Sequence, residues 1–476
     1  MENKFKYSLF MLAVSSVLVG CGGGDSGGEK PVPDNTPEFS YSFGEPEALD
    51  ETAGGYSSLT VNYNDGVQLS TWVRNGQVFS NYNNLKSEQS NTHKLTKGVF
   101  DSYIPQGGEY ENKPVKSLDF AVMDNGVPCG AWVDKQVDTG DAGLTHTLNL
   151  LYSCYDANAD TWSQPLIVKQ VTLGKDVNAQ LIRDVRVANI NANSQMLTYR
   201  LAENNSFVEH NFYASKLNDG VPDSRLYNKL IGQKLDTISS SIAKANTFSQ
   251  DGEPILFWFY RDNGTDELTV NVFNGGSTMP LPVPTDSTFK YSLSLVNDNS
   301  YLLYSQRDSK GEWSIGGENW NKKDRLEFTP VAGEVHGLVA EGDSNTDSIV
   351  VAWIEKKDRK DSVLDEYSIK VNHFLGGQLQ KEEVLVSELS GASNLQVSKV
   401  GDSYILTWLE RVSSKSSVVK MIEYGNDEWS KVSSFNCGSS CGEFDKISVD
   451  TEFGQMSASI TYTSSRGVET ASGAKI

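Results

Sequence analysis

The chain is short of positive charge relative to negative charge. Its 41 Lys and Arg residues stand against 62 Asp and Glu residues, which gives a net charge of −21 at pH 7. Phosphate backbones and anionic lipid headgroups repel such a chain, so this balance opposes binding to either of them. We interpret the acidic excess as a source of solubility, with an acidic recognition surface as the alternative.

Signatures of several enzyme classes are also missing. The five histidines are scattered, and the chain has no HExxH pair, no GxSxG elbow, no P-loop and no GxGxxG fingerprint after a strand. The missing motifs argue against the enzyme classes that they mark. They do not argue against a glycosidase, because its paired carboxylates leave no local sequence signature.

Long apolar runs are absent beyond the first twenty residues. Tyr7–Val19 is mostly apolar and is preceded by Lys4 and Lys6, which is the pattern of an export signal. The run is too short to span a bilayer as a mature helix, and nothing later approaches the roughly 18 apolar residues that a spanning helix needs.

The export signal ends in Leu18-Val19-Gly20-Cys21, which resembles the lipobox of bacterial lipoproteins. The resemblance implies cleavage before Cys21, a diacylglycerol on its thiol and an acyl chain such as palmitate on its new amino group. Several acyl chains hold a protein on a membrane durably, whereas one chain is marginal. Gly rather than Asp at position 22 implies the outer membrane, on its periplasmic or its surface face. The alternative is an ordinary secretory signal with a chance cysteine.

The residues after Cys21 predict a tether. Residues 22–38 read GGGDSGGEKPVPDNTPE, a composition that cannot bury enough apolar surface to offset the entropy of ordering. We therefore predict a signal peptide over 1–20, a lipid-anchored flexible linker over 21–38 and a folded domain over 39–476.

Four cysteines remain in the predicted folded domain. An even number in an exported chain indicates two disulfides. Cys129 and Cys154 fall near facing ends of two consecutive predicted strands, which suits a cross-strand bridge. Cys437 and Cys441 are close enough in sequence to close a small loop. A zinc site of four cysteines is the alternative, although the spacing lacks two CxxC-type pairs.

One strand-like pattern recurs eight times along the chain. Each copy is β-rich, carries an aromatic residue and is followed by a charged residue and a turn. The marker aromatics are Trp72, Trp132, Tyr199, Trp258, Tyr304, Trp353, Trp408 and Tyr462. Their spacings of 46 to 67 residues are typical of a β-propeller, whose blades are four-stranded sheets.

The repeat predicts an all-β fold, a propeller of eight or alternatively seven four-stranded antiparallel blades. The last unit, 446–473, is one strand short, and 39–43 alternates aromatic and small residues. We expect 39–43 to be the outer strand of the final blade, since an open edge strand invites aggregation. If this segment belongs elsewhere, seven blades become the better count. A chain of several β-sandwich domains is the structural alternative.

Three units contain a Trp-Ser step after a turn, at Trp162-Ser163, Trp313-Ser314 and Trp429-Ser430. These steps distantly resemble the repeats of sialidase-type propellers, although the Ser-x-Asp-x-Gly-x-x-Trp box of that family has no full copy here. We expect them to pack between blades, with the acidic turn residue capping backbone N–H groups.

Basic residues follow most of the marker aromatics and are candidates for anion binding. Arg is suited to bidentate contacts with a carboxylate or a sulfated glycan. The candidate ligand-binding residues are Arg74, Arg200, Arg261, Arg307, Arg411 and Arg466. The alternative is that they pair with neighbouring Asp or Glu side chains at the ends of exposed strands.

Two stretches have the spacing Asp-x-Asn-x-Asp, which places alternate oxygen ligands on a tight loop and suits Ca²⁺. The candidate ligands are Asp156, Asn158 and Asp160 in one loop, and Asp343, Asn345 and Asp347 in the other. Neither loop has the Gly or the distal Glu of an EF-hand, and acidic surface turns are the alternative.

These observations predict a monomeric outer-membrane lipoprotein whose propeller is a binding or scaffold module for an envelope protein or glycan, with no catalytic residue assigned and no resident cofactor. The layout is similar to that of a propeller lipoprotein among outer-membrane assembly factors, although the Gly-x-x-x-Trp blade signature of that family is missing. A sialidase-type glycan-processing enzyme and a calcium-dependent adhesin are the alternatives.

Overall fold

The regular structure that the computed structural model describes consists of β-strands. The described residues are 36–52, 56–64, 66–84, 87, 89–96, 99–100, 118–140, 143–173, 182–202, 210–242, 255–261, 268–274, 277–282, 294–296, 301–308, 310–319, 325–328, 330–343, 346–357, 365–400, 402–413, 416–435, 447–453, 457–464 and 467–475. Within these ranges there is no helix with the length and apolar character to cross a membrane. The chain divides into two units, Met1–Thr36 and Pro37–Ile476, and the description below concerns the second.

Three sheets precede residue 283. The first contains β3 (Tyr56–Asn64), β4 (Val67–Arg74), β5 (Gln77–Asn84) and β6 (Gln89–Lys94). The second contains β7 (Val99–Phe100), β8 (Leu118–Val122), β9 (Pro128–Gly140), β10 (Gly143–Asp156), β11 (Thr161–Trp162) and β12 (Leu166–Leu173). The third contains β13 (Ile182–Asn191), β14 (Ser194–Ala202), β15 (His210–Asn218), β16 (Val221–Pro222), β17 (Lys229–Ile242), β18 (Ile255–Arg261), β19 (Leu268–Asn274) and β20 (Ser277–Pro282).

Four further sheets complete the described strands. The fourth sheet contains β21 (Ser294–Val296), β22 (Tyr301–Arg307), β23 (Trp313–Asn319) and β24 (Arg325–Leu326), and the fifth contains β25 (Glu334–Asp343), β26 (Ser348–Lys357), β27 (Glu366–Leu375) and β28 (Gln378–Leu389). The sixth contains β29 (Ala392–Val400), β30 (Ser403–Ser413), β31 (Ser416–Gly425), β32 (Glu428–Trp429) and β33 (Ser433–Ser434). The last contains β34 (Ile447–Phe453), β35 (Ser457–Ser464) and β36 (Gly467–Lys475) together with β1 (Tyr41–Phe43) and β2 (Glu47–Asp50). The last set is called the closing sheet below.

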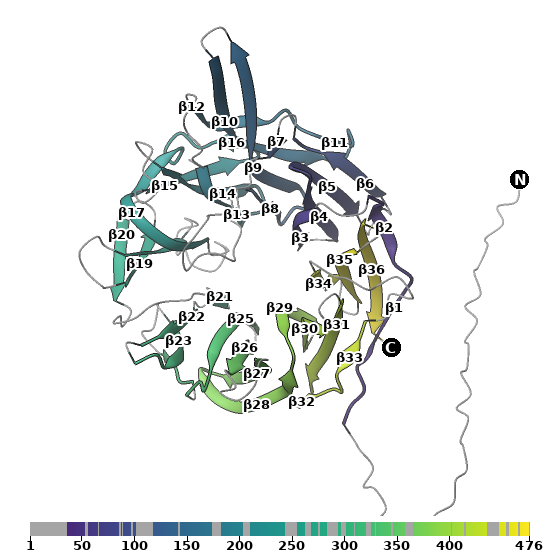
Figure 1. The fold of residues 1–476 in the computed structure, drawn as a ribbon. Helices are drawn as coiled ribbons and strands as arrows, with labels where there is room; N and C mark the ends of the chain where they lie inside the picture. Colours follow the sequence, from purple (N-terminus) through teal and green to yellow (C-terminus); the bar gives the residue numbers. More distant parts are fainter. Residues whose placement is uncertain are drawn as a thin grey trace, which may run out of the picture. The chain divides into compact units, whose positions relative to one another are not determined.

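The sheets of the second unit lie around a common centre, with one edge of each sheet inward (Figure 1). All pairings between the described strands are antiparallel, and neighbours in sequence pair with one another. This is the all-β propeller architecture that the repeat predicts.

The eight marker aromatics occupy one structural position. They lie on β4, β9, β14, β18, β22, β26, β30 and β35, which we call the second strands. Each of these pairs with a strand on both of its sides. Those whose side chains are described are buried, with Trp72, Tyr199, Trp408 and Tyr462 at 0% exposure. The recurring sequence pattern therefore marks the strand that is enclosed within each unit.

One long strand, β17, belongs to two successive groups of four strands within the eight-stranded sheet. The repeat pattern, which predicts separate four-stranded sheets, does not indicate this shared strand. The first half of β17 pairs with β15, up to Leu235, and its second half pairs with β18, from Asp236 onward. Neither proline nor a Gly-containing turn interrupts 233–242. The chain therefore passes from the outer edge of one unit to the inner edge of the next without leaving the extended conformation.

The hydrophobic core lies between sheets. One cluster joins Leu69 and Tyr82 of the first sheet to Phe120 and Trp132 of the second. Similar clusters join the second sheet to the third, β21–β24 to β25–β28, β25–β28 to β29–β33, and β29–β33 to the closing sheet. Because a buried aromatic side chain removes roughly 150–250 Å² from water, these seams supply much of the apolar burial.

Local sequence explains two tight places in this packing. Asn75 and Gly76 have φ angles of 49° and 72°, as a type I′ turn between β4 and β5 requires. A Cβ atom at Gly130 would lie 1.9 Å from the ring of Phe120. Glycine at that position therefore lets the Phe120 ring lie directly on the backbone of β9.

The N-terminal strand completes the closing sheet, as predicted. β1 pairs with the C-terminal strand β36, from Tyr41 opposite Lys475 to Phe43 opposite Gly473. β2 continues along the same strand. The C-terminal strand therefore forms hydrogen bonds with a strand near the start of the unit Pro37–Ile476, and the sheet that 447–475 leaves short gains its outer strand.

Candidate functional site

The charged residues after the marker aromatics lie at or near the ends of second strands. Second strands run in the same sense in every unit, so these ends share one face of the ring of sheets. Arg74 forms an ion pair there with Asp50 of the closing sheet, and its guanidinium Cζ lies 4.7 Å from the centre of the Phe79 ring. The positive charge of Arg74 is therefore neutralised by a carboxylate of the same chain.

The other predicted arginines do not converge with Arg74. Arg200 is buried in an ion pair with Asp184 on the adjacent strand β13. Arg307 is exposed, and its Nε donates to the carbonyl oxygen of Gly311 at 3.1 Å. Arg411 is exposed at the end of β30. The side chain of Arg261 and all of Arg466 lie outside the described residues.

A cavity of about 430 Å³ adjoins the turn after Arg307. It is lined by Gly311, Glu312, Trp313, Pro330, Val331 and Ala332. Trp313 also packs against the core between the β21–β24 and β25–β28 sheets. The lining thus combines an aromatic ring, aliphatic side chains and a single carboxylate.

The first predicted calcium loop is held by its own hydrogen bonds. Asp156 Oδ1 accepts bonds from the backbone N–H of Asn158 at 2.9 Å and of Ala159 at 3.3 Å. Asp160 accepts a hydrogen bond from the hydroxyl of Tyr155 and lies 3.2 Å from Nε2 of His93. The Tyr155 hydrogen bond lowers the pKa of Asp160.

The second predicted loop contributes to a contact between sheets. Asp343 Oδ2 lies 2.9 Å from Lys399 Nζ on β29 and accepts a 2.9 Å hydrogen bond from Thr346. Asp347 has a φ of 55°, which suits a turn, and Asn345 lies outside the described residues. Across the described ranges, no three His, Cys, Asp or Glu side chains are arranged to hold a metal ion.

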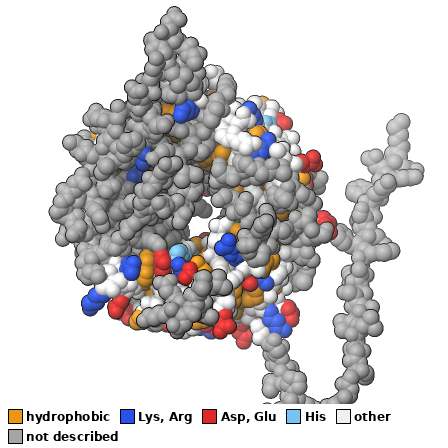
Figure 2. Space-filling model, viewed as in Figure 1, with side chains coloured by type: hydrophobic (Ala, Val, Ile, Leu, Met, Phe, Trp, Pro, Cys, Tyr) orange, Lys and Arg blue, Asp and Glu red, His pale blue; other side chains and the backbone are white. Residues whose placement is uncertain are grey.

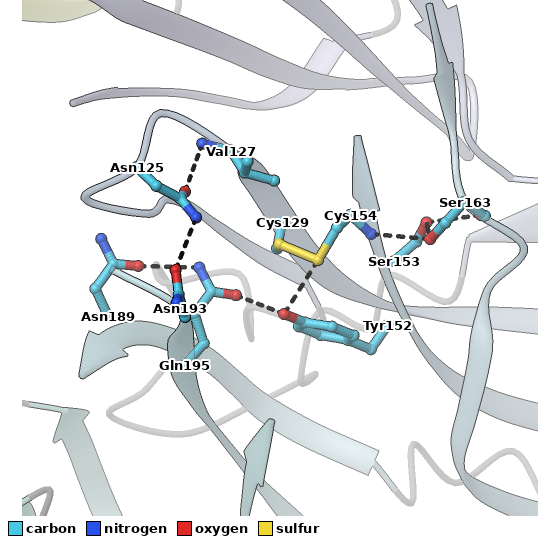
Figure 3. Close-up of a disulfide and its surroundings, with 10 residues drawn as sticks. All are labelled: Asn125, Val127, Cys129, Tyr152, Ser153, Cys154, Ser163, Asn189, Asn193 and Gln195. Atoms are coloured by element: carbon cyan, nitrogen blue, oxygen red, sulfur yellow. Dashed lines mark hydrogen bonds between the residues drawn. A yellow bond between two sulfur atoms is a disulfide. The ribbon is translucent and has the colours of Figure 1, made fainter. Parts of the chain in front are cut away.

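Cys129 and Cys154 form a disulfide across β9 and β10, as predicted. It adjoins a chain of buried polar groups (Figure 3). The Tyr152 hydroxyl donates to Gln195 Oε1 at 2.7 Å, and Gln195 Nε2 donates to Asn189 at 2.9 Å. These bonds join the second sheet to the third. Cys437 and Cys441 lie outside the described residues.

The Trp-Ser steps pack between sheets, as predicted. Trp162 Nε1 donates to Ser80 Oγ in the first sheet at 3.0 Å, and its ring meets Phe120 edge to face. Ser163 Oγ accepts from the N–H of Cys154 at 3.2 Å. In the β29–β33 sheet, Ser430 Oγ accepts from the N–H of Glu423 at 3.0 Å in the same way.

Sequence reasoning missed two histidines that lie in these seams. His373 Nδ1 lies 3.1 Å from the Tyr424 hydroxyl, and His373 Nε2 lies 2.9 Å from Ser348 Oγ. His93 makes an equivalent contact with Tyr155, at 5.4 Å between ring centres. A sequence signal for these contacts was available, because a tyrosine precedes each of the two Trp-Ser steps: Tyr155 precedes Trp162, and Tyr424 precedes Trp429.

The segment just before β1 is bound across two sheets. The carbonyl of Pro37 accepts a 2.6 Å hydrogen bond from the N–H of Lys431, and Lys431 Nζ lies 2.8 Å from Glu38 Oε1. Phe39 and Tyr41 are buried against the β29–β33 and closing sheets. We call residues 37–43 the strap.

No protein-family model and no curated protein matches this chain. Among solved structures, the chain is similar to the Dos1 propeller, with 8% identity over 92% of this chain and 95% of that chain and a TM-score of 0.47. It is also similar to the propeller domain of the trilobed protease from Pyrococcus furiosus, with 7% identity, coverage of 83% and 98%, and a TM-score of 0.42. TolB from Acinetobacter baumannii has 12% identity, coverage of 72% and 80%, and a TM-score of 0.33.

Proposed function

We propose that this chain is an outer-membrane lipoprotein, anchored through Cys21, whose eight-bladed propeller binds a protein or glycan partner in the cell envelope. Eight second strands carry eight marker aromatics, and the eight-stranded sheet divides at β17 into two four-stranded units. With the closing sheet built from both ends of the chain, each unit corresponds to one blade.

One observation carries this proposal. The predicted tether is followed directly by the strap, whose last three residues form β1, the outer strand of the closing sheet. In the proposed arrangement, a lipid, a short tether and the propeller follow one another along the chain. A closed propeller is stiff because each sheet packs on two neighbours, and stiff bodies that display loops are suited to recognition.

The arginine contacts favour binding over sialidase-type catalysis. That chemistry needs several arginines converging on one carboxylate of the substrate, whereas Arg74 and Arg200 are each neutralised by an aspartate of the protein. We observe no feature in the described ranges that favours the enzyme or the calcium-dependent adhesin over a binding module.

The anchor is tested by labelling cells with a palmitate analogue and fractionating their membranes. We expect label on the wild-type protein in the outer-membrane fraction, and neither label nor membrane association in the Cys21→Ser variant. Equal labelling of both forms would contradict the assignment of Cys21.

The binding role is tested by crosslinking intact envelopes and purifying the acylated protein. We expect a discrete protein or glycan to be recovered with the wild-type chain and lost when the exposed propeller loop that contacts it is replaced. Turnover of a sialylated or sulfated glycan by the purified protein would instead support the enzyme alternative.

A further inference from the structure

The strap determines where the tether leaves the folded body. The Pro37 carbonyl and the Glu38 carboxylate are both bonded to Lys431, between β32 and β33. The side chains of Phe39, 8% exposed, and Tyr41, 6% exposed, are buried in the core and fix the rest of the strap in place. The chain therefore departs from a fixed point on the outer edge of the β29–β33 sheet, which we call the strap rim.

The tether is short compared with the folded body. Thr36 lies 15 positions after Cys21, and a Gly-rich segment of that length has a root-mean-square extension of about 20 Å. Strands lie about 4.8 Å apart, so two opposite four-stranded sheets alone span about 30 Å. A lipid on Cys21 therefore keeps the strap rim within reach of the membrane, whereas the opposite side of the ring can lie farther from it.

The charge of the strap rim suits this placement. Residues 391–435, which form the β29–β33 sheet, contain five Lys or Arg and five Asp or Glu. Residues 334–389 of the preceding sheet contain six and twelve, in keeping with the acidic chain as a whole. An anionic surface therefore repels the β29–β33 sheet less than its acidic neighbour. Residues 182–222 of the β13–β16 sheet contain four Lys or Arg and four Asp or Glu, so charge permits this placement without selecting it.

The outer edge of this sheet also has a side-chain pattern compatible with a lipid surface. Lys431 is followed by Val432, whose side chain is 42% exposed, and Lys420 lies on the neighbouring strand with its Nζ 2.9 Å from Ser434 Oγ. Lysine stems can lie along the interface while their ammonium groups stay in water. On the face of the molecule in Figure 2, basic, acidic and hydrophobic side chains are mixed along the rim that carries β25–β33.

We infer that the strap rim lies against the lipid surface, so that the propeller stands on edge at the membrane with the sheet of β13–β16 turned away from it. This inference rests on the proposed lipid anchor at Cys21. This orientation leaves both faces of the ring and the β13–β16 sheet accessible to a partner. A partner would then bind away from the membrane.

The orientation is tested with the full acylated chain in vesicles of phosphatidylethanolamine and phosphatidylglycerol that contain a headgroup-nitroxide lipid. A fluorophore is attached through azidophenylalanine at position 432 or, as the matched control, at position 221. Val221 is 63% exposed on β16, and Figure 1 places β16 on the far side of the ring from β32. We expect quenching to be several-fold stronger at position 432 than at position 221.

A lengthened tether provides the second measurement. Inserting about thirty Gly and Ser residues after Gly28 increases the root-mean-square extension by about 1.7-fold and leaves the folded body unchanged. We expect the quenching difference between positions 432 and 221 to shrink. Vesicle flotation with equal quenching at both positions in the wild-type tether would overturn the orientation alone. Failure to float would overturn the anchor itself.

Discussion

The indole Nε1 of Trp72 donates a 3.0 Å hydrogen bond to Oδ2 of Asp50, although Trp72 belongs to the first sheet and Asp50 to the closing sheet. The same carboxylate pairs with Arg74. The corresponding indoles of Trp132, Trp353 and Trp408 are buried without a hydrogen-bond partner. A directional polar link therefore distinguishes the seam between the closing sheet and the first sheet from the seams that contain Trp132, Trp353 and Trp408.

Removing this link should weaken the closure of the ring. In Asp50→Ala, the Trp72 indole and the Arg74 guanidinium lose their acceptor while remaining largely shielded from water, which costs about 2 kcal/mol of stability. Urea unfolding followed by tryptophan fluorescence measures the loss. The control Asp402→Ala removes an exposed carboxylate and should change stability by less than about 0.5 kcal/mol. Equal effects of both substitutions would show that the contact does not stabilise closure.

The strap should stabilise the propeller through apolar burial. Phe39→Ala empties a site between the β29–β33 and closing sheets, and large-to-small substitutions of this kind cost about 3 kcal/mol. A loosened β1 also exposes the edge of β36, so aggregation on heating should increase. Calorimetry combined with light scattering reports both effects. Glu45→Ala, at an exposed side chain outside the strap, is the matched control, and an unchanged midpoint in Phe39→Ala would argue against the strap.

The disulfide should contribute measurably to stability. Cys129 and Cys154 are 25 residues apart, and closing a loop of that size in the unfolded chain stabilises a protein by about 3 kcal/mol. The double variant Cys129→Ala/Cys154→Ala should therefore melt at a lower temperature than the wild type. Adding a reductant should lower the wild-type midpoint toward that of the variant and leave the variant unchanged. A wild-type midpoint that does not respond to complete reduction would contradict this.

His373 should make stability fall in mild acid. Burial lowers its pKa, opposed by nearby Asp427 and assisted by Lys381. The unfolded chain therefore binds a proton more readily than the folded one. Stability is retained above the ordinary histidine pKa of about 6.5 and decreases as pH falls through and below that value. Thermal midpoints at about pH 7.5 and about pH 5 should differ more in the wild type than in His373→Gln.

The control for that experiment is Gln380→Ala, which replaces an exposed, uncharged side chain in the same sheet. It should leave the difference between the two pH values unchanged. If His373→Gln keeps the full pH dependence, the acid sensitivity originates in another group.

The regular part of the fold was predictable because burial imposes a periodic pattern. The aromatic of every second strand must fill the space between two sheets, so Trp353 and Trp408 recur with similar neighbours. The pairing of 39–43 with the last strand was also predictable, since 446–473 is one strand short. The continuous strand β17 was not, because a missing turn leaves no positive signal in the sequence.

The candidate site was less predictable than the fold. Sequence spacing places Arg74 and Arg200 at equivalent strand ends, but it does not reveal Asp50 and Asp184 beside them. The histidine contacts at Tyr155 and Tyr424 join residues 51 to 62 positions apart, on different sheets. Such contacts depend on how neighbouring sheets are staggered, which no local pattern encodes.

The order of residues by itself determined the strand pattern, the repeat and the lipobox-like segment, because each is a pattern of residue types along the chain. The tertiary structure alone decided which charges are neutralised and where the tether leaves the body. Those properties depend on contacts between residues that lie apart in the sequence, such as Asp184 and Arg200 on two adjacent strands, or Glu38 and Lys431, whose charged atoms lie 2.8 Å apart. The packing of neighbouring strands and sheets brings them together.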